Sequence, residues 1–276
     1  MLKRCKVEML KRSNFTICLK SPATLQLYNI STLQLHQMKL NIFNNQEELN
    51  EQLAQYVIAI ANKAIADKNR FDFVLTGGSS PKGLYKLLST TYKNQIDWDK
   101  TYFFFGDERT VLPFEKDYNG LMAKESFFDN LELKDGHIFY VDTNLPPKEA
   151  AEDYKERLDK HFDGSSIVFD LILLGMGDDA HTASIFPHTD LVNNKEATVA
   201  SVWVEKLNTY RVSLTALLIN QAKNIAFITF GENKAKALQK VLGTEKDFAS
   251  YPSQLINPID GNLQWFVDEA AASLLK

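Results

Sequence analysis

Short apolar runs alternate with longer amphipathic segments along this chain, and that alternation constrains the fold more than any other feature. The runs at residues 71–75, 102–105 and 169–174 are apolar almost throughout, as in strands that are buried on both faces. In the longer segments, apolar residues recur at helical spacing, as Leu49 and Leu53 do. Strands that alternate with helices predict an α/β domain with a mostly parallel sheet and helices on both of its faces.

The same pattern assigns most of the chain to individual elements. We expect strands at residues 40–43, 71–75, 102–105, 138–141, 169–174, 198–204, 211–214 and 225–230. We expect helices at residues 47–67, 81–88, 119–128, 146–161, 232–242 and 263–275. No linker-like, low-complexity or repeated segment interrupts this pattern, so residues 39–276 are expected to form a single domain.

Residues 1–37 do not share the pattern. They carry several lysines and arginines but a single acid, Glu8, and they contain no long apolar stretch. A basic, acid-poor segment is typical of a transit peptide. Residues 38–43, however, read like a natural start that runs into a first strand, which would make residues 1–37 a leader or a mis-assigned start. We expect a disordered N-terminal extension in either case.

Composition narrows the classes of function. The net charge of −4 disfavours a nucleic-acid or anionic-membrane partner, which would require a basic face. No apolar run reaches the roughly 18 residues of a spanning helix. Both cysteines, Cys5 and Cys18, lie in the N-terminal segment, so no disulfide framework supports the fold. We therefore expect a cytoplasmic protein that binds neither nucleic acid nor membrane.

Polar clusters follow three of the predicted strands, at the sheet edge where open α/β proteins bind ligands. Gly77, Gly78, Ser79 and Ser80 lie in "TGGSSP", where a glycine-rich turn enters a helix. Such a turn suits a phosphate, although it is also a common helix cap. It matches neither a Walker A loop nor a dinucleotide fingerprint, so we expect no nucleotide cofactor.

The second cluster is "GDER", which brings Asp107 and Arg109 to the end of the aromatic strand. These charges are either a solvated loop or an orienting carboxylate and a guanidinium that holds an oxyanion.

The third cluster, "GMGDDAHTAS", contains His181 and the acids beside it. A histidine here is either structural or a general base whose proton affinity the acids adjust. Two histidines seven positions apart, with no cysteine near, do not suggest a metal site. Ser184 lies in no Gly-x-Ser-x-Gly elbow, which disfavours a serine hydrolase.

Two basic residues follow later in the chain. Arg211 opens "RVSLT", and Lys234 lies in the first turn of a predicted helix. A lysine at that position opposes the helix dipole. It is therefore either an exposed surface lysine or part of an anion site.

Taken together and in this order, these segments resemble 6-phosphogluconolactonases of the glucosamine-6-phosphate isomerase/6-phosphogluconolactonase family, over residues 39–276. The resemblance is carried by "TGGSSP", by "GDERTVLP" with Asn119, by "LLGMGDDAHTASIFPHT", "RVSLT" and "GENKAKAL", and by the C-terminal "YPSQLINPIDGNLQWFVDEAAA". It implies a Rossmann-like fold and cofactor-free, metal-free hydrolysis of 6-phospho-D-glucono-1,5-lactone in the oxidative pentose phosphate pathway. The expected partner is this small molecule, bound by a monomer or weak homo-oligomer.

The resemblance also implies a role for each candidate residue. His181 would be the base that activates water, with Asp179 as its orienting acid and Asp107 and Arg109 beside the reacting carbonyl. The residues expected to hold the 6-phosphate are Gly77, Gly78, Ser79, Ser80, Arg211 and Lys234. Three positions depart from the family pattern. Ala180 replaces a glycine, Ser80 a threonine and Tyr118 a serine.

Other functions fit the same fold. A glucosamine-6-phosphate deaminase-like isomerase would have an Asn-Glu-Pro where this chain has Phe186 and Pro187 without an acid. A non-catalytic sugar-phosphate sensor would carry an N-terminal DNA-binding domain, for which residues 1–37 are too short. An inactive paralogue is the third alternative, and Ala180 is the only residue that suggests it.

Overall fold

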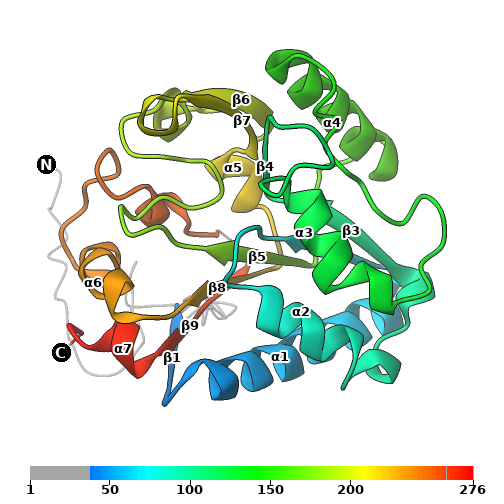
Figure 1. Ribbon diagram of the computed structural model, residues 1–276, viewed down its shortest axis with the longest axis horizontal. Coiled ribbons are helices and arrows are strands. Elements are labelled where there is room, and N and C mark those ends of the chain that lie inside the picture. Colours follow the sequence, from blue (N-terminus) through cyan, green and yellow to red (C-terminus); the bar gives the residue numbers. More distant parts are fainter. Residues whose placement is uncertain (1–37, 259, 276) are drawn as a thin grey trace, which may run out of the picture. The chain divides into compact units, whose positions relative to one another are not determined.

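The centre of the protein is a parallel β-sheet. The computed structural model describes residues 38–258 and 260–275, where six parallel strands lie in the order β1-β9-β8-β5-β2-β3 (Figure 1). The strands are β1 (Lys39–Phe43), β2 (Phe71–Leu75), β3 (Thr101–Phe105), β5 (Leu171–Gly175), β8 (Asn224–Thr229) and β9 (Asn262–Asp268). The extension expected at residues 1–37 lies outside the described residues.

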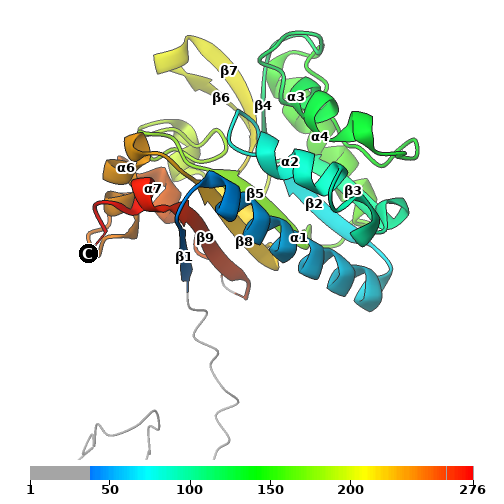
Figure 2. The same cartoon turned by 60° about the horizontal axis from the view of Figure 1, so that its bottom comes forward.

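Helices cover both faces of this sheet, as the sequence predicts. The helices are α1 (Gln46–Lys68), α2 (Lys82–Ser89), α3 (Asn119–Ser126), α4 (Pro147–His161), α5 (Ala216–Ile219), α6 (Ala235–Leu242) and α7 (Glu269–Ala272). One apolar core contains buried residues of α1, α2 and α3, and the other contains residues of α4, α5 and α6. Figure 2 shows α1 running across the sheet.

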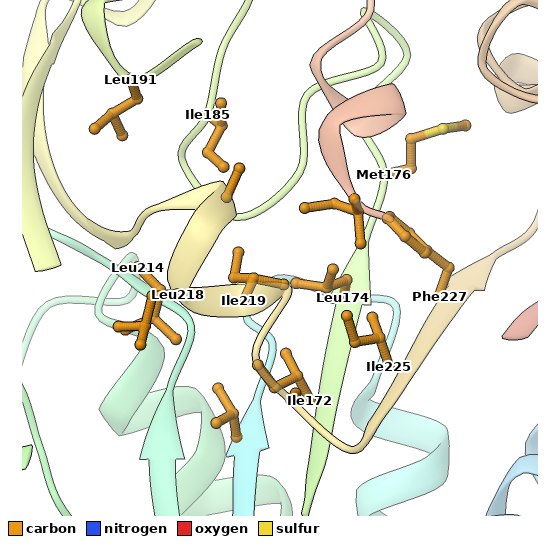
Figure 3. Packing of buried hydrophobic residues seen from close by; sticks show 14 of the residues in the cluster. Ile172, Leu174, Met176, Ile185, Leu191, Leu214, Leu218, Ile219, Ile225 and Phe227 are labelled. Atoms are coloured by element: carbon orange, nitrogen blue, oxygen red, sulfur yellow. The ribbon is translucent and has the colours of Figure 1, made fainter. Parts of the chain in front are cut away.

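The two cores explain why the strand at 171–175 is apolar throughout. Ile172 and Leu174 point into the core that also holds Ile219 and Phe227 (Figure 3). Leu171 and Leu173 point into the other core, because successive side chains of a strand face opposite ways. The strand therefore has no solvent-facing side, and it lies in the interior of the sheet as expected.

A second, smaller sheet is antiparallel. Within the described ranges it contains β4 (Asp107–Arg109), β7 (Thr209–Leu214) and β6 (Val199–Val204), in the order β4-β7-β6. The sequence predicts β6 and β7 as strands, but not the pairing of β7 with the charged residues after β3. Gly106 joins the two sheets, since its N–H donates to Leu75 O and its carbonyl accepts from Leu214 N.

Two expected elements are wrong. Residues 138–141 form no strand, and Ile138 makes an isolated bridge to Phe103. Residues 263–275 are not one helix, because Asn262–Asp268 is β9, inserted between β1 and β8, and only Glu269–Ala272 is helical. The aromatic and β-branched residues of this strand favour a sheet, and the helix-forming alanines begin after it. None of the helices in the described ranges is both long and apolar enough to span a bilayer.

Candidate active site

A polar cavity of about 340 Å³ lies at the carboxyl ends of the strands. The cavity brings together segments that are far apart in the sequence, as expected for strand ends that meet at one sheet edge. All but one of the predicted site residues line it, namely Gly77, Gly78, Ser79, Ser80, Asp107, Arg109, His181, Arg211 and Lys234. The exception, Asp179, contacts the cavity through His181.

His181 and Asp179 form a hydrogen-bonded pair. The distance between His181 Nδ1 and Asp179 Oδ1 is 2.5 Å, and the His181 ring stacks on Phe186 with centroids 3.9 Å apart. When Nδ1 carries the ring proton and donates a hydrogen bond to the carboxylate, Nε2 is the ring nitrogen that can accept a proton. This arrangement suits a general base, because the ring is fixed on two sides and still lines the cavity.

The Asp179 carboxylate remains ionised in this setting. Partial burial acts to raise its pKa, but the hydrogen bond and charge of His181, followed by the hydrogen bond from Lys206, hold that pKa well below the usual range. A fixed negative charge beside the ring stabilises the imidazolium that forms whenever His181 takes a proton.

The loop that presents His181 depends on Gly177 and on an unusual Ala180. A Cβ on Gly177 would overlap the His181 ring and lie 2.5 Å from Asp179 Oδ1, so a side chain there would separate the pair. Ala180 is fully buried and has φ 62°, in the left-handed region that favours glycine. Ser253 fixes this peptide, since its N–H and hydroxyl both donate to Ala180 O, at 3.0 and 2.8 Å. Ala180, which replaces the glycine of the family pattern, thus lies at a position where glycine would relieve backbone strain.

Asp107 and Glu108 serve opposite sides of β4. Ser184 Oγ donates to Asp107 Oδ2 at 2.7 Å, so the serine that the sequence disfavours as a nucleophile instead positions the Asp107 carboxylate. Glu108 points away from the cavity and accepts from the first backbone N–H groups of α3, those of Asn119 and Gly120, at 2.7 and 2.9 Å. Burial raises the pKa of Glu108 to about 8, against the effect of these donors. The sequence does not predict this anchoring role.

Three cations face the glycine-rich turn. Arg109 and Arg211 are directly opposed in the register of β4 and β7, and Lys234 lines the same cavity. Burial, followed by the charge of Arg109, lowers the pKa of Arg211. Among the described residues, none of the three forms a salt bridge. Half-buried positive charges that form no salt bridge with protein carboxylates are the arrangement expected of an anion site.

The glycine-rich turn is held close to this cluster. Gly78 has φ 82°, a conformation that glycine adopts without strain. Gly77 leaves no room for a side chain, because a Cβ there would overlap the Asn119 amide, whose Nδ2 donates to Asp107 O at 2.9 Å. The Asn119 side chain therefore links the turn to β4.

Sequence reasoning missed Lys206 as a neighbour of the site and did not assign a role to Tyr118. Lys206, at the tip of the β6–β7 hairpin, donates to Asp179 Oδ2 at 2.9 Å, and nothing in its local sequence distinguishes it from a surface lysine. Tyr118 proves to be structural, since it is buried and its hydroxyl donates to Val141 O at 3.0 Å.

The fold and this cavity define a Rossmann-like α/β protein with a polar cavity, lined by several cations, at its strand ends. A sequence profile described as glucosamine-6-phosphate isomerases/6-phosphogluconolactonase matches residues 44–265. The chain belongs to this family, and the resemblance found in its motifs is confirmed.

Individual relatives agree with this assignment. The chain is 36% identical over 243 residues to a 6-phosphogluconolactonase from Nostoc sp., covering 86% of this chain and 98% of that protein. The structure of 6-phosphogluconolactonase from Trypanosoma brucei superimposes with a TM-score of 0.76 at 25% identity, over 87% of this chain and all of that one. A monomeric glucosamine-6-phosphate deaminase shares the fold, with a TM-score of 0.74 at 20% identity over 86% of this chain and 100% of that one.

Proposed function

We propose that this protein hydrolyses 6-phospho-D-glucono-1,5-lactone to 6-phospho-D-gluconate in the oxidative pentose phosphate pathway, with His181 as general base. The observation that carries the proposal is that His181, which is hydrogen-bonded to Asp179, lines one cavity together with the cations Arg109, Arg211 and Lys234. A base beside a phosphate-sized cationic site suits a phosphorylated substrate that reacts with water. The 6-phosphogluconolactonase relatives support this choice among the activities of the family.

In the proposed reaction His181 Nε2 takes a proton from water as the water oxygen bonds to C1 of the lactone. Arg109 stabilises the negative charge that develops on the carbonyl oxygen. The bond between C1 and the ring oxygen then breaks, and His181 returns its proton to that oxygen. The carboxylic acid formed loses its proton to solvent. A positioned base contributes about 10²–10⁴-fold, which is sufficient for a lactone that already hydrolyses in water.

The remaining residues bind the substrate in this proposal. Ser79, Ser80 and the amides of the glycine-rich turn hold the 6-phosphate together with Arg211 and Lys234. Asp107, oriented by Ser184, accepts a hydrogen bond from a sugar hydroxyl at the lactone end of the cavity.

The proposal is tested with the purified full chain and freshly prepared lactone, by following proton release. We expect rapid hydrolysis, abolished in His181→Ala, while that variant still binds 6-phosphogluconate in calorimetry. His188→Asn is the matched control, because His188 is a nearby histidine outside this cavity. Full activity in His181→Ala would refute the role of His181. Binding of 6-phosphogluconate by the unmodified protein without turnover would indicate a sensor, and release of ammonia from glucosamine 6-phosphate would indicate a deaminase.

Three further expectations belong to this proposal. Residues 39–276 are taken as the catalytic domain and residues 1–37 as an extension, so a chain that starts at Met38 should keep full activity. The protein is taken to act in the cytoplasm as a monomer or weak homo-oligomer. Fluorescence localisation of the full chain and light scattering at two concentrations test these points.

A further inference from the structure

The Asp179 carboxylate has a hydrogen-bonding partner on each of its two oxygens. Oδ1 lies 2.5 Å from His181 Nδ1, and Oδ2 lies 2.9 Å from Lys206 Nζ. Asp179 and His181 belong to the loop after β5, whereas Lys206 comes from the short turn Glu205–Leu207 between β6 and β7. The contact therefore joins the base to the small antiparallel sheet.

We propose, on the basis of the function inferred above, that Lys206 is a positioning residue for the reaction. It holds the Asp179 carboxylate in the orientation that accepts from His181, and its positive charge partly offsets the negative charge that Asp179 places beside the imidazole.

The electrostatic effect of Lys206 follows from the order of the charges. A carboxylate in contact with a histidine favours the imidazolium, which cannot take a proton from water. A lysine on the far oxygen of that carboxylate offsets the effect. The hydrogen bond and charge of Asp179 raise the pKa of Lys206, so the lysine stays positively charged. Because its side chain is 61% exposed, solvent limits the influence of this charge to a modest size.

No other cation contacts Asp179 among the described residues. The charged or titratable groups that line a cavity with His181 or Lys206, or act on Lys206, are Asp107, Arg109, Asp178, His188, Asp190, Glu205, Arg211 and Lys234. Glu205 is engaged by Trp203, whose Nε1 donates to it at 2.6 Å. In the described ranges, Lys206 is thus the one residue outside the His181–Asp179 pair whose side chain donates a hydrogen bond to the Asp179 carboxylate.

The test compares Lys206→Met and Lys206→Arg with the unmodified full chain. For Lys206→Met we expect the acid limb of the kcat/KM profile to move to higher pH by about half a unit, which lowers the rate roughly threefold at the acid end. We expect Lys206→Arg to restore the profile, and KM at pH 8 to change little. Lys63→Met is the matched control, since it breaks an exposed lysine–aspartate pair of 2.7 Å on α1, away from the site.

The same variants are titrated by NMR with ¹⁵N-labelled histidine, which does not depend on turnover. The His181 titration should move in Lys206→Met in the same direction as the kinetic profile. An unchanged titration would overturn the inference, and so would a rise in KM without a shift of the profile, which would place Lys206 on the substrate. If the unmodified protein lacked lactonase activity, the proposed function would fail while the NMR titration still decided the role of Lys206.

Discussion

Arg109 and Arg211 lie directly opposite each other on the antiparallel strands β4 and β7. Like charges in this position repel each other across the sheet. No carboxylate among the described residues neutralises either side chain through a salt bridge. We therefore expect this pair to cost stability in the empty protein, and we expect an anion bound at the proposed site to offset that cost.

We accordingly expect Arg211→Met to weaken ligand binding while leaving the protein at least as stable. The loss of a charge-assisted contact to phosphate corresponds to about 1.5–3 kcal/mol, or roughly 10–150-fold in the Kd of 6-phosphogluconate. Relief of the repulsion should leave the free energy of unfolding unchanged or raised by a few tenths of a kcal/mol.

Calorimetry and urea denaturation measure the two effects. Arg157→Met is the control, because Arg157 pairs with Asp153 on α4 and donates to Tyr140 O, away from the candidate site. It should lower stability without changing the Kd. Unchanged affinity in Arg211→Met would mean that this arginine does not contact the phosphate.

Gly177→Ala should abolish activity without unfolding the protein. Its Cβ would overlap the His181 ring, so the hydrogen bond to Asp179 would be broken or the ring displaced. We expect kcat to fall by at least 10²-fold, as for the loss of a positioned base.

Gly175→Ala is the matched control two residues earlier, where a Cβ would meet only Thr76 Oγ1 at an ordinary 3.6 Å. It should keep activity within a few-fold. Circular dichroism checks that both variants are folded, and comparable kcat values in the two would contradict the steric argument.

The sequence predicts that most of the site residues lie together, because their positions follow one rule of parallel sheets. Ser79, Asp107 and His181 each follow a buried strand, and parallel strands end at a common edge. Lys206 and Ser184 could not be found in this way. Lys206 reaches Asp179 only because a hairpin folds back over the loop, which is a tertiary contact with no local signal. The assignment of β9 failed because its apolar residues are followed at once by a helix-forming alanine run.

A buried charge cluster at the other end of β2 should control stability in acid. Asp72 is fully buried and accepts from Lys68, Arg70 and His161, at 2.5, 3.0 and 2.8 Å. Burial acts to raise the pKa of Asp72, but the hydrogen bonds from His161 and Lys68 and the neighbouring charges lower it overall. An aspartate with a lowered folded-state pKa stabilises the protein at pH values above its unfolded pKa of 3.8, and this stability is lost as pH falls through the folded value.

We therefore expect Asp72→Asn to cost about 3 kcal/mol at neutral pH, as for a broken buried ion pair. The difference from the unmodified protein should shrink as the pH falls below 3.8. Urea denaturation between pH 3 and 8 tests this. Asp67→Asn, which breaks the exposed pair with Lys63, should cost less than about 1 kcal/mol throughout. A difference for Asp72→Asn that stays constant across the pH range would disprove the assignment.

Ala180→Gly should change stability little, because two effects oppose each other. Glycine relieves about 1 kcal/mol of strain in the left-handed backbone conformation. The substitution also removes a buried methyl group, which costs about 0.8 kcal/mol. The greater conformational entropy of glycine stabilises the unfolded chain by a further ~0.4–1 kcal/mol. We expect a net loss of less than about 1 kcal/mol in the free energy of unfolding, with kcat unchanged within about twofold. Ala180→Val, which places a β-branched residue in the left-handed region, should cost more than about 2 kcal/mol. Thermal melts and steady-state kinetics measure both, and a clearly stabilised glycine variant would show that the methyl is poorly packed.

The pairing of β1 with β9 has a consequence for how the protein is made. Among the described strands, β1 has no neighbour in the sheet except β9, and Ala180, which precedes His181, is held by Ser253. When Lys234 has been added to the nascent chain, every residue that lines the cavity has been synthesised, but Ser253 and β9 have not. We therefore expect the nascent chain to become active only after β9 has been translated and has left the ribosome.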